Sequence, residues 1–151
     1  MAARDKKWKK GRGTLGVMEP VLGRWVANAE SPQGKVRCTR TFTKVLNGKF
    51  VQLVAEWRIG KSRYEEIALY GAGADGRLGF WSFTSDGKRS QGKLVKVREV
   101  HPEAFGFEAK MPAGTARMIF WPAEGVGFHW AVEAKTKKGW RRFTEHHCKR
   151  A

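Results

Sequence analysis

The sequence predicts an all-β fold, in which about ten antiparallel strands form a meander that closes into a lipocalin-like barrel. Apolar and polar residues alternate along most of the chain, and turn residues interrupt this alternation at short, regular intervals. No segment between these turns is long enough for the crossover helix that parallel strands require. Because a long meander otherwise leaves two edge strands unpaired, we expect it to close on itself.

Composition agrees with a single β domain. The chain has 151 residues, including 18 glycines, seven tryptophans and nine phenylalanines. Abundant aromatics with frequent glycine favour strands joined by tight turns. We expect a basic disordered tail over residues 1–13 and the barrel domain over residues 14–151, which starts with a short lead-in at 14–22. The expected strands are 23–30, 36–46, 49–59, 63–71, 78–84, 89–99, 104–111, 115–121, 127–135 and 140–148.

The predicted turns have recognisable chemistry. Asn47-Gly48 is the strongest hairpin signal, and Asp75-Gly76 and Asp86-Gly87 repeat the pattern. The stretch "GAGADG" at 71–76 matches a dinucleotide-binding pattern, but such a motif must open a helix. It lies here between two predicted strands, so we interpret it as a turn.

Charge is concentrated at the two ends. The formal net charge is +16; residues 1–12 contribute six basic and one acidic side chain, and residues 135–151 contribute seven and one. Basic residues interleaved with aromatics, as in "KKWKKGRG" and "KKGWRRF", can contact phosphates and stack on bases. Sequence-independent nucleic-acid binding through the basic ends is therefore one alternative function.

Period-two alternation gives each strand an apolar and a polar face. Val51, Leu53, Ala55 and Trp57 share one face of their strand. A ten-stranded barrel encloses more volume than an eight-stranded one, so we expect a cavity among the aromatic side chains. The predicted ligand-binding residues, with polar groups to hold a ligand head, are Trp25, Trp57, Tyr70, Trp81, Phe107, Phe120, Trp130, Arg142 and His146.

Several motifs, in this order, resemble one family. "EPVLGRWVANAE" places a Gly-x-Trp at the first strand, "TFTKVLNGKFVQLVAEW" resembles the second hairpin, and "EEIALYGAGADGRLGFWSFTSDGK" and "GWRRFTEHHCKR" resemble the later strands. Together they resemble a bacterial family of small lipocalin-like (calycin-type) barrels of unknown function, distantly similar to nitrobindin. The resemblance implies a barrel with an inner cavity. It also implies haem as an alternative ligand, held by a last-strand histidine, although His146 and His147 come later in the strand than that histidine.

No catalytic motif is present, so we expect non-catalytic binding of a small hydrophobic or amphipathic molecule. Neighbouring residues on a strand point to opposite faces, which separates Glu65 from Glu66 and His146 from His147. We therefore expect no metal site. The cysteines have no zinc-like spacing, and we expect them to be reduced in a cytoplasmic protein. No apolar run approaches the length of a membrane span.

Overall fold

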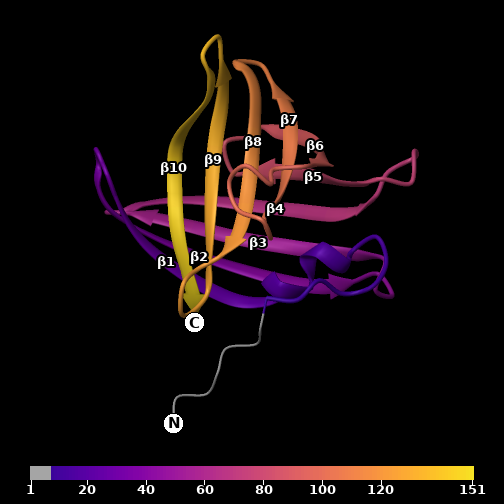
Figure 1. Cartoon of the computed structure of the whole chain (residues 1–151). Coiled ribbons are helices and arrows are strands. Elements are labelled where there is room, and N and C mark those ends of the chain that lie inside the picture. The colour runs from indigo at the N-terminus through magenta and orange to yellow at the C-terminus, as the bar shows by residue number, and fades with distance from the viewer. Residues whose placement is uncertain (1–7) are drawn as a thin grey trace.

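The computed structural model describes residues 8–151 and shows the predicted closed antiparallel barrel (Figure 1). Each strand pairs with its neighbours in the sequence, and β1 pairs with β10 to close the sheet. The elements are η1 Gly16–Val21, β1 Gly23–Ser31, β2 Gly34–Val45, β3 Phe50–Ile59, β4 Ser62–Ala72, β5 Leu78–Thr84, β6 Arg89–Val95, β7 Phe105–Met111, β8 Gly114–Pro122, β9 Phe128–Thr136 and β10 Gly139–Arg150.

The predicted strands are confirmed, and the largest difference is at the end of β6. The sequence predicts this strand to continue to residue 99, but it ends at Val95. Val97 then leaves the sheet and is completely buried, against Gly106, where no side chain occupies the space. Alternation in the sequence continues past this point, so periodicity alone does not reveal that the chain has turned inward.

The predicted turns at 46–49 and 73–77 are also confirmed. Asn47-Gly48 lies in the hairpin between β2 and β3, where Leu46 and Asn47 adopt positive φ. In "GAGADG", the Gly73 amide donates to the Arg77 carbonyl and the Gly76 amide to the Gly73 carbonyl. This segment connects β4 to β5 and precedes no helix.

One end of the barrel is covered by the chain before β1. Met18 and Val21 of η1 are completely buried in the main core cluster. Trp8 packs against Phe105 and Phe128, and its indole N–H donates to the Glu103 carbonyl at 3.1 Å. Residues 1–7 of the predicted disordered tail lie outside the described residues. Of residues 8–13, Trp8 is partly buried against the core cluster.

A bulge in β10 changes which of its side chains face the interior. The register against β9 shifts between Arg142 and Thr144. His146 and Cys148 are buried inside, whereas Arg142 lies on the outer surface with Glu133. Strict alternation places Arg142 and His146 on one face, and the extra residue at the bulge makes that expectation wrong.

Within residues 8–151, no helix is long and apolar enough to cross a membrane.

Candidate functional site

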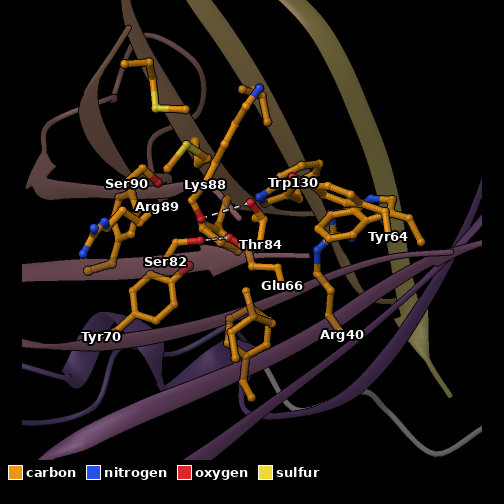
Figure 2. Close-up of a pocket in the computed structure, with 18 residues that line it drawn as sticks. Arg40, Tyr64, Glu66, Tyr70, Ser82, Thr84, Lys88, Arg89, Ser90 and Trp130 are labelled. Carbon is orange, nitrogen blue, oxygen red and sulfur yellow. Dashed lines mark hydrogen bonds between the residues drawn. The ribbon is translucent and has the colours of Figure 1, made fainter. Parts of the chain in front are cut away.

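The barrel encloses a cavity of about 220 Å3. Its walls are mainly aromatic and aliphatic, and its polar side chains come from β2, β4, β5, the β5–β6 turn and the start of β6 (Figure 2). It is lined by Arg40, Phe42, Leu53, Trp57, Tyr64, Glu66, Tyr70, Phe80, Ser82, Thr84, Lys88, Arg89, Ser90, Met111, Met118, Phe120, Trp130 and Val132.

Arg40 is the principal cation of this cavity. It lies on the inward face of β2, between Cys38 and Phe42, and only 1% of its surface is exposed. Its guanidinium carbon lies 4.0 Å from the centroid of the Trp130 ring and 5.4 Å from that of Trp57. These contacts with two aromatic faces stabilise the cation inside the barrel.

The side chain of His146 points into the barrel and contacts Arg40. Both terminal nitrogens of Arg40 donate to His146 Nδ1 at 3.2 Å, so this nitrogen is the acceptor and Nε2 carries the proton. Burial and the neighbouring Arg40 charge lower the pKa of His146 to about 4. His146 is therefore neutral at pH 7 and supports Arg40 from behind the cavity wall.

The two cysteines lie near the same arginine. Arg40 also donates to Cys148 Sγ at 3.4 Å, and Cys38 and Cys148 are both buried and free. Burial raises the pKa of Cys38 to about 12 and raises that of Cys148 as well. Both are therefore neutral thiols at pH 7 and are poor nucleophiles.

A second polar group is formed by Glu66, Ser82 and Tyr70. The Ser82 hydroxyl donates to Glu66, and Figure 2 shows the Tyr70 hydroxyl pointing toward these two side chains. Burial raises the pKa of Glu66, while the bond from Ser82 and the Arg40 charge partly oppose this effect. Burial also raises the pKa of Tyr70, which keeps its hydroxyl protonated as a donor.

The cavity reaches the surface at the end of the barrel opposite η1. Its exposed lining residues there are Tyr64 at the start of β4, Lys88 and Arg89 at the β5–β6 turn, and Met111 at the end of β7. These residues form the mouth of the cavity. Two of the four are cations, so the mouth attracts anions.

The structure brings some of the predicted ligand-binding residues to this cavity and not others. Trp57, Tyr70, Phe120 and Trp130 line it. Trp25 and Phe107 are buried in the adjoining core, and His146 lies behind Arg40.

Trp81 and Arg142 lie outside the cavity. Trp81 alternates with the buried Phe80 and Ser82 on β5, and it contributes to an outer groove beside Lys93. Arg142 donates to Glu133 at 3.0 Å and to Glu145 at 2.6 Å on the outer surface. Neither residue therefore contacts a ligand inside the barrel.

The polar lining residues that the sequence does not predict include Arg40, Glu66 and Ser82. A signal for Arg40 is present, since the alternation that places Val36, Cys38 and Phe42 on the apolar face of β2 includes the arginine. Glu66 was correctly separated from Glu65 by strand geometry. Sequence alone does not place Glu66 beside Ser82, so it predicts no role for Glu66.

The outer face of the last strands carries a buried ion-pair network. Arg117 donates to Glu133 at 2.8 Å and to Glu99 at 2.7 Å, and Arg142 pairs with the second oxygen of Glu133. Arg117 lies over the Trp140 ring, at 4.3 Å from its centroid. This network joins β8, β9 and β10 and occupies the arginine that the sequence suggested for a ligand.

The residues do not fit haem or a metal ion. His146 Nδ1 accepts from Arg40, and the permanent positive charge of Arg40 opposes an iron centre beside that imidazole. His147 points outward, with its Nε2 2.8 Å from the Val126 carbonyl. Across the part of the chain that the structure describes, no group of three or more histidine, cysteine or acidic side chains is arranged to hold a metal.

Comparison with known protein families finds no matching family model for this chain, and no curated protein matches it.

Proposed function

We propose that this protein binds a small amphipathic molecule inside the barrel, without catalysing a reaction. The observation that carries the proposal is the aromatic cavity with the buried Arg40 in its wall. Apolar walls remove the body of a ligand from water, and a few placed polar groups orient it. We also propose membership of the bacterial lipocalin-like family and a cytoplasmic location, which the two free cysteines support.

The size of the cavity limits the ligand. Its volume of about 220 Å3 is below the roughly 300–1,000 Å3 of sites for drug-sized molecules. The expected ligand is therefore a short chain or a single ring system with one polar end. A macrocycle the size of haem exceeds this space.

Nucleic-acid binding has less support. The sequence suggests it because basic residues lie beside Trp8, Trp140 and Phe143. Trp8 packs against core aromatics, and Arg117 lies over Trp140, so a base stacking there would first have to displace an arginine of the protein itself. Of these three rings, Phe143 is the exposed one.

The proposal is tested by filling the cavity. Val132 lines it, and Val132→Phe adds volume inside the barrel. Val54 lies on the outer face of β3, and Val54→Phe is the matched control. We expect an environment-sensitive apolar dye, followed by fluorescence, to bind the wild type and the Val54→Phe variant. The folded Val132→Phe variant should bind it at least about tenfold more weakly, because about 1.4 kcal/mol of lost contacts gives that ratio.

Equal dye binding by both variants would place the dye outside the barrel and reject the proposal. Native mass spectrometry of the purified protein is the direct complement, since a retained ligand would be seen as an added mass and released on denaturation.

A further inference from the structure

We propose that the ligand of this cavity is a carboxylate with an apolar body, and that its carboxylate pairs with Arg40. The inference rests on the proposed function and names the chemical class of its ligand. It depends on the charge balance inside the barrel, on the hydrogen-bond donors that remain free there and on the single charge that the site can neutralise.

Among the described residues, the charge of Arg40 has no counter-ion within ion-pair distance. Within residues 8–151, its hydrogen bonds go to His146 Nδ1 and Cys148 Sγ, which are neutral acceptors at pH 7. A guanidinium remains charged at every relevant pH, and buried charges are normally paired. Because Arg40 is buried and lines a cavity, an anionic ligand bound there can serve as its counter-ion.

Free donors accompany this charge. Arg40 carries five N–H groups, and its bonds to His146 and Cys148 do not use the Nε–H. Tyr70 is only 5% exposed and lines the same cavity, yet its hydroxyl makes no hydrogen bond with the residues that the structure describes. The Nε–H of Arg40 and the Tyr70 hydroxyl therefore lack a protein acceptor among residues 8–151, and a carboxylate oxygen is the acceptor that a guanidinium N–H binds most strongly.

Glu66 limits the ligand to one negative charge. It lines the same cavity, close enough for the Arg40 charge to act on it but beyond ion-pair distance. Ionised, Glu66 repels an anion. Protonated, it can donate its own hydrogen bond to one. Lys88 and Arg89 lie at the mouth, so a dianionic phosphate in the buried part of the cavity would face Arg40 and this acidic group, and a monoanion is the better match.

A cationic ligand is the opposing hypothesis, with Glu66 as its partner. Arg40 would repel such a ligand inside the barrel, and Lys88 and Arg89 would repel it at the mouth. The same two mouth residues attract a carboxylate before it enters. All three permanent cations that line the cavity therefore favour the anion.

The test compares three ligands with the same tail, octanoate, 1-octanol and octylamine, by calorimetry at pH 7 and below their aggregation concentrations. We expect octanoate to bind the wild type at least about tenfold more tightly than octanol, because a hydrogen bond between charged groups is stronger than one between neutral groups. Octylamine should bind most weakly.

Two variants assign the effect. Arg40→Met keeps the length of the side chain without its charge, and we expect it to lose the preference for octanoate over octanol. Glu66→Gln carries a hydrogen-bond donor and no charge at any pH, so we expect it to bind octanoate at least as tightly as the wild type does while leaving octanol binding unchanged. If Arg40→Met does not fold, Glu66→Gln and the ligand series still test whether the cavity prefers a carboxylate.

Equal affinity for octanoate and octanol, tighter binding of octylamine, or weaker octanoate binding by Glu66→Gln would each overturn the carboxylate assignment. If the apolar dye enters the cavity but octanoate does not bind, only this inference fails. If neither the dye nor any of the three ligands binds, the proposed function fails with it.

Discussion

His146 connects the interior polar groups to the pH dependence of folding. Its pKa is about 4 in the folded protein, against an ordinary value of 6.5, because the side chain is buried beside Arg40. Between these two values the unfolded chain binds the proton and the native protein does not. The stability from this group is therefore complete above pH 6.5 and is lost as the pH falls toward 4.

We expect the free energy of unfolding to fall by about 3 kcal/mol over this window, since each unit of pKa corresponds to about 1.4 kcal/mol. His146→Asn retains an acceptor for Arg40 but does not titrate, so this part of the pH dependence should disappear. Denaturant unfolding of both proteins from pH 7 to pH 4 measures the difference. Glu66 titrates in both, and its contribution cancels. If the free energies of unfolding of the two proteins changed with pH in parallel, His146 would take up its proton in the native state at the same pH as in the unfolded chain, which would contradict the lowered pKa.

Single residues also mark the limit of sequence reasoning. Alternation correctly places Trp57 and Tyr70 inside, because each lies on a regular strand. It also places Arg40 inside, but a charged residue in an apolar pattern is ordinarily assumed to point to solvent. Trp57 of the neighbouring β3, together with Trp130 and the neutral His146 of β9 and β10, stabilises Arg40 there. The neighbours on β9 and β10 become visible only once the barrel is closed.

In the last strand, β10, the alternation of the sequence does not predict which side chains face the interior. β10 carries one extra residue near Phe143, which is 61% exposed, and the faces exchange across it. Arg142 consequently contacts Glu133 outside, while His146 contacts Arg40 inside. A bulge has no distinctive composition here, so the sequence predicts the strand correctly and half of its faces incorrectly.

Glu133 holds three strands together through that outer network. It is 6% exposed and accepts from Arg117 on one oxygen and from Arg142 on the other. Glu133→Gln removes its charge and leaves Arg117, also buried, with only the exposed Glu99 as a counter-ion among the described residues. We expect a loss of about 3 kcal/mol in the free energy of unfolding, because removal of one partner strands the other charge.

Glu145→Gln is the matched control, because Glu145 pairs with the same Arg142 but is substantially exposed. We expect this change to cost less than about 1 kcal/mol. Denaturant unfolding at low and at moderate salt gives both values. A Glu133→Gln variant as stable as the control would mean that solvent or Glu99 compensates Arg117 fully.

The whole barrel follows from local signals to a large extent. The turn residues predict most of the hairpins, and consecutive hairpins give the meander order without any long-range information. Closure is different, because it joins the two ends of the sheet. β1 meets β10 in only two register pairs, Trp25 with Arg150 and Val26 with Lys149, whereas β1 matches β2 along its whole length.

Trp25 is the residue on which this closure depends. Its indole N–H donates to the Val21 carbonyl of η1 at 2.7 Å, its ring meets Phe128 at 4.7 Å, and Arg150 lies over it at 4.1 Å. One side chain therefore connects η1, β1, β9 and β10. We expect Trp25→Ala to cost about 3–5 kcal/mol as a large-to-small core substitution.

We expect the stability lost in Trp25→Ala to appear first as local opening between β1 and β10, before the whole barrel unfolds. Because β1 and β10 share few hydrogen bonds, removal of Trp25 should let them separate while the β2–β3–β4 hairpins remain paired. Hydrogen exchange followed by mass spectrometry should show faster exchange in β1, β10 and η1 and little change in β3. Trp81→Ala, on the outer face of β5, is the control and should leave the exchange of β1 and β10 unchanged. Equal acceleration in every strand of the Trp25 variant would show that the barrel opens as one cooperative unit, with no weaker seam between β1 and β10.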